Sequence, residues 1–281
     1  IIGLTTTQVG ALLTAQVATL STASVVALQD ADLAALSTGQ MRAFSAAQLQ
    51  AFSTGDIALF STTQASSLTG VQVGALTTNQ VQALTTSQVT NLTPDQVNSF
   101  TTEQIAKLEN ADVAVLQASQ FATVTADQVQ AFTTSQISQL STSVVAGLTD
   151  TQLGALTTAQ LSNMTTTQLD AMSAAKITAL SSTQVGALTT AQLGVMSTDD
   201  ILALGTAQVS ALTTSQLQAL SQAQVRALES AEVATLSTTQ LQALSANQFK
   251  AFSTDDVAAL TTAQVAALTT DQVKAMSPAN I

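Results

Sequence analysis

The 281-residue sequence contains no cysteine, histidine, tryptophan or tyrosine, and only two prolines. Without cysteine there are no disulfides and no thiolate ligands for a metal. Because histidine is missing too, zinc sites, thiol nucleophiles and Ser-His-Asp triads are excluded. We therefore expect a protein that is not an enzyme, with no catalytic, cofactor-binding or metal-binding residues and no cofactor.

Basic residues and long apolar runs are also scarce. Six Lys and Arg stand against 17 Asp and Glu, and the net charge of −11 argues against binding to nucleic-acid phosphates. Hydrophobic residues make up 46% of the chain. Ser, Thr and Gln nevertheless interrupt every apolar run well before the roughly 18–20 residues that a membrane span needs. We expect no nucleic-acid partner, no membrane insertion and a thin internal core.

What the sequence does contain is an eight-residue repeat. It runs without insertion or deletion from Thr5 to Met276 as 34 consecutive octads, and residues 261–268, TTAQVAAL, show it in clean form. The consensus is Ser/Thr, Thr, any, Gln, aliphatic, any, Ala, Leu. In one continuous α-helix, each octad would rotate its apolar positions by about 80° around the axis. Supercoiling does not correct this drift, because coiled coils keep their apolar residues in line with repeats of seven or eleven residues and not of eight. A single unbroken helix is therefore excluded.

The first and fourth positions of the octad predict where helices begin. The first is Ser or Thr in 28 of 34 octads, and the fourth is Gln in 25 and Asp or Glu in six more. Ser/Thr-x-x-Gln/Glu is the capping box, in which two side chains satisfy two backbone donors at a helix start. The sequence therefore predicts an all-α solenoid of short capped helices, one of about six residues in each octad.

Proline and charge placement support helices over strands. Pro94 and Pro278 both occupy the second position, which is the first helical residue. Of 17 acids, 16 lie in positions one to four, and five of six bases lie in positions six or seven, as a helix dipole favours. The alternative is a β-solenoid, suggested by the Thr and Val content. Its strands would alternate with period two, whereas positions seven and eight are adjacent and both apolar.

Two patterns invite a functional interpretation. Acids cluster in the octads 29–36, 109–116 and 229–236 and in the pairs Asp199-Asp200 and Asp255-Asp256. A cation site is one interpretation, but carboxylates that answer exposed N–H groups at a helix start are the favoured one. Asn91 and Asn163 lie in N-glycosylation sequons. The repeat itself generates these, because any Asn at position seven is followed two residues later by Ser or Thr.

The organisation follows from the uniform repeat. No linker or composition shift interrupts residues 1–281, so we expect one continuous solenoid. Ile1 and Ile281 both fall at the fifth position, in mid-octad, and we expect a window on a longer array. A lone octad cannot fold, because packing exists only between octads. We expect neighbouring helices to approach each other closely at position seven, and the side chains at position six to face solvent.

The number of octads in one turn of the solenoid stays open. The repeat is compatible with helical hairpins of two octads and with spirals of three or more octads per turn.

Blocks of the form Leu-Thr-Thr-x-Gln-Val/Leu-x-Ala-Leu occur at residues 76–84, 212–220 and 260–268. With them the whole chain resembles the long Thr/Ser/Ala/Gln-rich tandem-repeat proteins of bacterial surfaces, including adhesin-like giants and extracellular filament subunits. The likeness is one of repeat style and composition. It implies an extracellular or cell-surface structural role and names no ligand or catalytic residue.

Three classes of function remain after these exclusions. The favoured one is a structural protein, a filament subunit or an adhesin stalk or spacer outside a bacterial cell, which associates with itself end to end. A second is a regular-surface ligand binder of the ice-binding type, because paired threonines every eight residues could form a ladder. A third is a surface protein that carries glycans on its many Ser and Thr hydroxyls.

Overall fold

The computed structural model describes residues 3–276 and divides into two compact units, Ile1–Leu148 and Thr149–Ile281. The first unit contains α1 (Thr6–Gly10), α2 (Thr14–Ala18), α3 (Thr22–Val26), α4 (Asp30–Ala35), α5 (Thr38–Ala43), α6 (Ala46–Ala51), α7 (Thr54–Leu59), α8 (Thr62–Ser67), α9 (Gly70–Gly74), α10 (Thr78–Gln82), α11 (Thr86–Thr90), α12 (Pro94–Asn98), α13 (Thr102–Ile105), α14 (Asn110–Ala114), α15 (Ala118–Phe121), α16 (Ala126–Ala131), α17 (Thr134–Ile137) and α18 (Thr142–Gly147).

The second unit contains α19 (Asp150–Ala155), α20 (Thr158–Ser162), α21 (Thr166–Asp170), α22 (Ala174–Thr178), α23 (Ser182–Gly186), α24 (Thr190–Val195), α25 (Thr198–Leu202), α26 (Thr206–Ser210), α27 (Thr214–Ala219), α28 (Gln222–Arg226), α29 (Ser230–Thr235), α30 (Thr238–Ala243), α31 (Ala246–Phe249), α32 (Thr254–Ala258), α33 (Thr262–Ala266) and α34 (Thr270–Ala275). Residues 3–276 hold one helix in every octad and no strand, so the all-α solenoid is confirmed and the β-solenoid is wrong. One continuous solenoid over residues 1–281 stays a prediction.

Every helix of the described chain begins at the second position of its octad, and most of them carry the capping box. At α10 the backbone N–H of Gln80 donates to Thr77 Oγ1 over 3.2 Å, and the N–H of Thr77 donates to Gln80 Oε1 over 2.9 Å. Thr77 itself has extended backbone angles, φ −69° and ψ 157°, as a residue just before a helix does. Pro94 is the first helical residue of α12. Pro278, Ile1 and Ile281 lie outside the described residues.

The helices end without any left-handed residue. No residue between 3 and 276 has a positive φ, so the turn from one helix to the next needs no glycine. After α5, Phe44 adopts φ −68° and ψ 133°, and Ser45, which caps α6, adopts φ −72° and ψ 164°. Two consecutive extended residues, at positions eight and one, therefore link successive helices.

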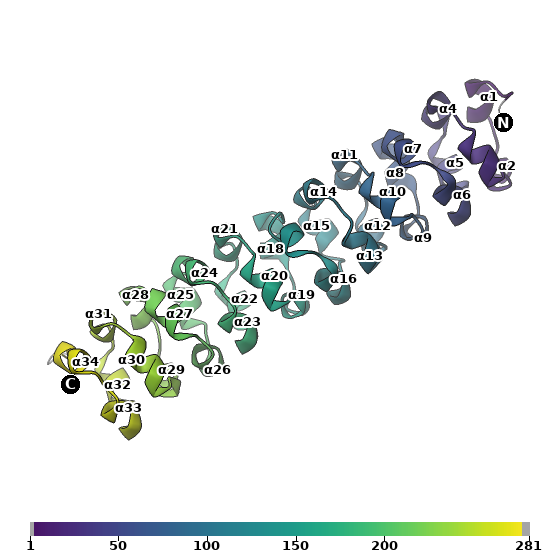
Figure 1. The fold of residues 1–281 in the computed structure, drawn as a ribbon. Helices are drawn as coiled ribbons and strands as arrows, with labels where there is room; N and C mark the ends of the chain where they lie inside the picture. Colours follow the sequence, from purple (N-terminus) through teal and green to yellow (C-terminus); the bar gives the residue numbers. More distant parts are fainter. Residues whose placement is uncertain (1–2, 277–281) are drawn as a thin grey trace. The chain divides into compact units, whose positions relative to one another are not determined.

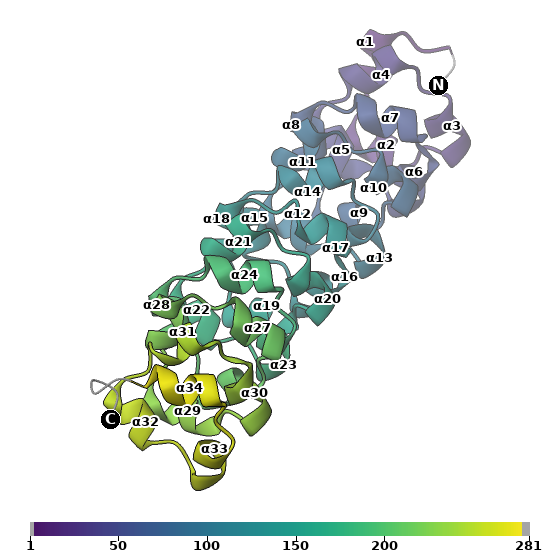
Figure 2. The same cartoon turned by 60° about the vertical axis from the view of Figure 1, so that its left-hand side comes forward.

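Each unit coils so that an octad meets octads three and four repeats away. Helices three apart pack against each other, for example α2 with α5 and α5 with α8, or α24 with α27 and α27 with α30. In Figure 1, α7, α11, α14 and α18 follow one another along one edge of the first unit, and α21, α24, α28 and α31 along one edge of the second. Figure 2 shows the same stacking from another side. One turn therefore takes between three and four octads, which rules out two-octad hairpins.

The core consists of positions five and eight, as the repeat predicts. At position five Val81 and Val89 are fully buried, and at position eight Leu92 is 5% exposed. The rings of Phe44, Phe52 and Phe60, at three successive eighth positions, pack edge to face with centroids 5.3 and 5.2 Å apart. No helix within residues 3–276 has the length and apolarity that crossing a bilayer requires.

Candidate functional site

The most regular feature of the interior is a ladder of glutamine amides at position four. Gln80 shows the pattern: its Oε1 accepts from the N–H of Thr77, and its Nε2 donates to the backbone carbonyls of Leu49 and Phe52 over 2.8 Å each. Those carbonyls belong to positions five and eight of the octad four repeats earlier. One buried amide thus uses both donors and its acceptor.

The ladder recurs in both units. Comparable bonds from Nε2 to an octad four repeats earlier are made by Gln40, Gln48, Gln64, Gln72, Gln88, Gln96, Gln104, Gln120, Gln128 and Gln136 in the first unit. In the second unit they are made by Gln184, Gln192, Gln208, Gln216, Gln224, Gln240, Gln248, Gln264 and Gln272. We name this set the glutamine ladder.

Sequence reasoning assigned position four only to the helix cap and missed the ladder. The signal was nevertheless present: Gln fills position four in 25 octads and Glu in one, Glu232. A capping box accepts Glu as readily as Gln, because it uses only one side-chain oxygen. A preference for the amide therefore indicates that the second end of the side chain must donate.

Acids at position four find different partners, or none. Asp32 Oδ1 accepts from Thr6 Oγ1 over 3.0 Å, and Asp256 Oδ1 accepts from Ser230 Oγ over 3.0 Å; each hydroxyl lies three octads earlier. Asp112 Oδ2 and Glu232 Oε2 are buried and have no hydrogen-bond partner among residues 3–276. Burial, followed by the charge of Glu109, raises the pKa of Asp112 to about 6, against the lowering effect of the Glu109 backbone N–H.

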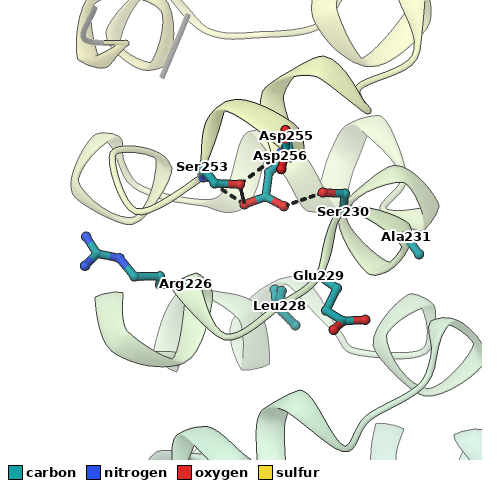
Figure 3. A pocket seen from close by; sticks show the side chains of 8 residues that line it. All are labelled: Arg226, Leu228, Glu229, Ser230, Ala231, Ser253, Asp255 and Asp256. Carbon is teal, nitrogen blue, oxygen red and sulfur yellow. Dashed lines mark hydrogen bonds between the residues drawn. The ribbon is translucent and has the colours of Figure 1, made fainter. Parts of the chain in front are cut away.

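The acid pair Asp255-Asp256 lines a surface hollow of about 440 Å³ together with Arg226, Glu229 and Ser230. In Figure 3, Asp256 faces Ser253 and Ser230, whereas Glu229 and Arg226 point away from it. Ser253 Oγ donates to Asp256 Oδ2 over 2.7 Å. Within the described chain no three acidic side chains gather to hold a metal ion. The helix-start interpretation explains Asp256 better than a cation site does.

Position six was expected to face water, and Arg42, Gln50 and Gln242 are exposed there, but their side chains also make hydrogen bonds. Arg42 Nε donates to the carbonyl of Ser67 over 2.8 Å, and Gln50 and Gln242 donate to the carbonyls of Ala75 and Ala267 over 2.7 Å each. Each bond runs to position seven of the octad three repeats later. These side chains lie on the surface but also join neighbouring turns.

Helices also approach each other closely at position six. A Cβ added to Gly74 would stand 2.8 Å from the carbonyl oxygen of Ser99, three octads later. Ser99, whose carbonyl makes this contact, is at position seven, where close approach was expected. Gly74 is at position six, and its lack of a side chain leaves room for the contact. Gly74 is required by this close approach and not by its backbone conformation, since its φ is not positive.

The two sequons lie at helix ends. Asn91 and Asn163 are exposed, and their Nδ2 groups donate to the carbonyls of Ser87 and Ala159 over 2.8 and 2.9 Å. Thr93, the hydroxyl residue of the first sequon, accepts from the N–H of Gln96 as a helix cap. The repeat thus explains the hydroxyl of that sequon without a glycan.

The ALTTAQ repeat family matches the chain at residues 25–62, 51–86, 72–102, 105–142, 164–198, 194–230, 225–262 and 250–281. The chain belongs to the ALTTAQ repeat family. No curated protein matches it. ALTTAQ segments thus tile most of the chain, in agreement with the octad array, and the expectation of no catalytic, cofactor-binding or metal-binding residue stays a prediction.

Proposed function

We propose that this ALTTAQ repeat chain is a non-enzymatic structural protein of a bacterial surface, a filament subunit or an adhesin stalk or spacer, and that it associates with itself end to end. The observation that carries the proposal is the glutamine ladder. Most glutamines at position four in the interior donate to an octad four repeats earlier. The octads at either end of the described residues keep unpaired donors and exposed core positions, which the matching end of a second copy would complete.

The amino-terminal octads keep free donors. Gln8 and Gln16 hold the ladder position and cap their helices, since their Oε1 atoms accept from the N–H groups of Thr5 and Leu13 over 2.8 Å. Their Nε2 groups find no acceptor within residues 3–276, and both side chains are exposed. By the register of the ladder, each would donate to an octad placed four repeats before it.

The carboxyl-terminal octads keep uncovered core. Val265 and Val273 occupy position five and are 50% and 52% exposed, whereas Val81 and Val89 at the same position are 0% exposed. The carbonyls of Val265 and Leu268 receive no glutamine amide from the described residues. Donors at one end and acceptors with apolar surface at the other are complementary, and such a head-to-tail contact extends without closing.

The extracellular, structural part of the proposal rests on sequence. The resemblance to tandem-repeat proteins of bacterial surfaces supports it, as does the lack of any recognisable catalytic constellation. A net charge of −11 should keep arrays apart laterally at low salt and allow lateral contact as salt screens the charge. End-to-end contact, which buries apolar surface and pairs neutral amides, should depend much less on salt.

Sedimentation velocity of the 281-residue protein, across protein concentration and salt, tests this proposal. We expect species that lengthen with concentration, and threads in negative-stain micrographs of the same samples. A monodisperse compact monomer under all conditions would contradict end-to-end association and leave a simple spacer.

A charge-matched pair of variants tests the mechanism. Gln8→Glu with Gln16→Glu keeps the capping oxygens but removes both end donors, and should weaken the association. Gln82→Glu with Gln218→Glu adds the same charge at exposed sixth positions and should leave association unchanged. Equal effects of the two double variants would show that charge, not the ladder, controls the contact.

A further inference from the structure

The glutamine ladder is interrupted at Asp112, the fourth-position residue of octad 109–116. Asp112 is 2% exposed, and its Oδ2 has no partner among residues 3–276. In the preceding octad Gln104 donates to the carbonyls of Val73 and Leu76, and in the following one Gln120 donates to those of Val89 and Leu92.

The register of the ladder defines what lies opposite Asp112. The carbonyls that a glutamine here would reach are those of Val81 and Leu84, at positions five and eight of octad 77–84. A carboxylate and two carbonyls are all acceptors, so the ionised acid brings no donor to this junction. A protonated carboxylic acid does bring one, because its O–H donates.

Octad 109–116 lacks a ladder amide on its other side too. The residue four octads later is Val144, which is buried and has no polar group to offer the carbonyls of Val113 and Leu116. Octad 109–116 is therefore tied to neither octad by a ladder bond when Asp112 is ionised. Protonation of Asp112 would supply the donor that a ladder bond of this octad needs.

We propose that Asp112 takes up a proton and that its Oδ2–H stands in for one of the two N–H donors of the missing glutamine amide, donating to the carbonyl of either Val81 or Leu84, so that octad 109–116 is a joint that acidification tightens. The step is a simple protonation: solvent supplies the proton, an O–H bond forms on Oδ2, and the site becomes neutral. No other bond is made or broken.

The surroundings contain little else that could titrate. Helices α11 and α17 pack against α14. The octads that contain them, 85–92 and 133–140, have no ionisable side chain, and neither do octads 77–84, 117–124 and 141–148. On its own octad Asp112 has Glu109, whose negative charge favours the neutral form of Asp112, and the octad before it contains Glu103 and Lys107.

The direction of the pH dependence follows from the pKa of Asp112, which is about 6 in the folded protein and 3.8 ordinarily. The folded state binds the proton of Asp112 more tightly than the unfolded state does, so protonation of Asp112 stabilises the fold. This stabilisation is complete when the pH is below the ordinary pKa of 3.8, and it is lost as the pH rises through about 6. Two pKa units correspond to roughly a hundredfold change in the equilibrium constant for opening the joint.

Asp112→Asn is the decisive variant, because asparagine has the shape of the protonated acid and donates at every pH. Hydrogen exchange of peptides covering residues 109–116, followed by mass spectrometry and corrected for intrinsic exchange, should be the same in the variant and the unmodified protein at pH 4. At pH 8 the unmodified protein should open more often, by up to about a hundredfold. The control is Asp127→Asn, which removes an exposed acid and should change neither value.

A second measurement observes the proton directly and does not depend on stability. In protein labelled with ¹³C at the aspartate carboxyls, the resonance missing from Asp112→Asn should titrate with a midpoint near 6. A midpoint near 3.8, or an exchange difference that is constant from pH 4 to 8, would overturn the proposal.

One alternative arrangement can also be tested. The hydroxyl of Thr86 stands at the register position from which Thr6 and Ser230 donate to Asp32 and Asp256. If Thr86 donated to an ionised Asp112 in solution, Thr86→Val would open the joint at pH 8, and the proposal would be wrong. We expect Thr86→Val to leave the pH dependence unchanged.

Discussion

Gln80 Nε2 donates a 2.8 Å hydrogen bond to the backbone carbonyl of Phe52, which lies 28 residues earlier in the sequence. The other end of the same amide accepts from the N–H of Thr77 over 2.9 Å. A single side chain thus fixes the start of its own helix and ties that helix to the octad four repeats before it. This double use makes position four the point at which local and superhelical structure meet.

Replacing Gln80 by glutamate should therefore be costly, although the capping box survives. The change removes both Nε2 donors, leaves the carbonyls of Leu49 and Phe52 without them and buries a carboxylate, at a cost of about 2 kcal/mol or more. Urea unfolding followed by far-ultraviolet circular dichroism measures it. Gln82→Glu, on the exposed face of the same helix, is the matched control and should cost little. Equal losses would mean that the ladder bond contributes nothing.

The caps themselves should contribute independently of the ladder. Changing Thr77, Thr85 and Thr93 together to Ala removes three side-chain acceptors, each of which receives an N–H over 3.2 Å, and should lose about 1 kcal/mol per site. The sixth-position residues Gln82, Thr90 and Asn98 offer a control triple change to Ala that should be nearly silent. Thermal melts of the two triple variants are the measurement, and identical melting would show that the octad register is wrong.

Glu232→Gln should stabilise the second unit. Glu232 Oε2 is buried without a partner in the described chain, and glutamine has the same shape with an amide donor in its place. Gln224 and Gln240 on either side make ladder bonds to Met196 and Leu212, so the restored donor should reach the carbonyls of Ile201 and Leu204. We expect a gain of about 1 kcal/mol.

Hydrogen exchange in octad 197–204 measures this gain locally. Glu229→Gln is the control, because it removes an equal charge from an exposed side chain three residues earlier. A gain of the same size in both variants would assign the effect to net charge rather than to the restored donor.

Whole octads should be removable, and half octads should not. Deleting residues 213–220 moves each later octad one place along an array of nearly equivalent octads, so the protein should remain folded and slightly less stable. Deleting residues 213–216 shifts cap residues into core positions for everything that follows. The helical content of the two deletion variants is measured by circular dichroism, together with their melting temperatures. If both deletions lowered stability equally, the result would argue against a strict repeat.

The sequence by itself determined the helices and the core. The capping box joins residues only three apart, and the turn after each helix needs only two extended residues, so both depend on residues that are close together in the sequence. That is why one short helix per octad over the described residues, the place of Pro94 and the burial of positions five and eight could all be predicted. It is also why the acid-rich helix starts, such as that at Asp256, could be explained without a metal.

Only the tertiary structure decided how the octads stack. A strict repeat fits two-octad hairpins and wider spirals equally well, because every octad presents the same surfaces. The choice depends on packing and hydrogen bonds between residues about 25 to 31 apart, such as Gln50 with Ala75 and Gln80 with Leu49. For the same reason the second role of position four and the unpartnered oxygen of Asp112 emerged only when octads three and four repeats away were in place around them.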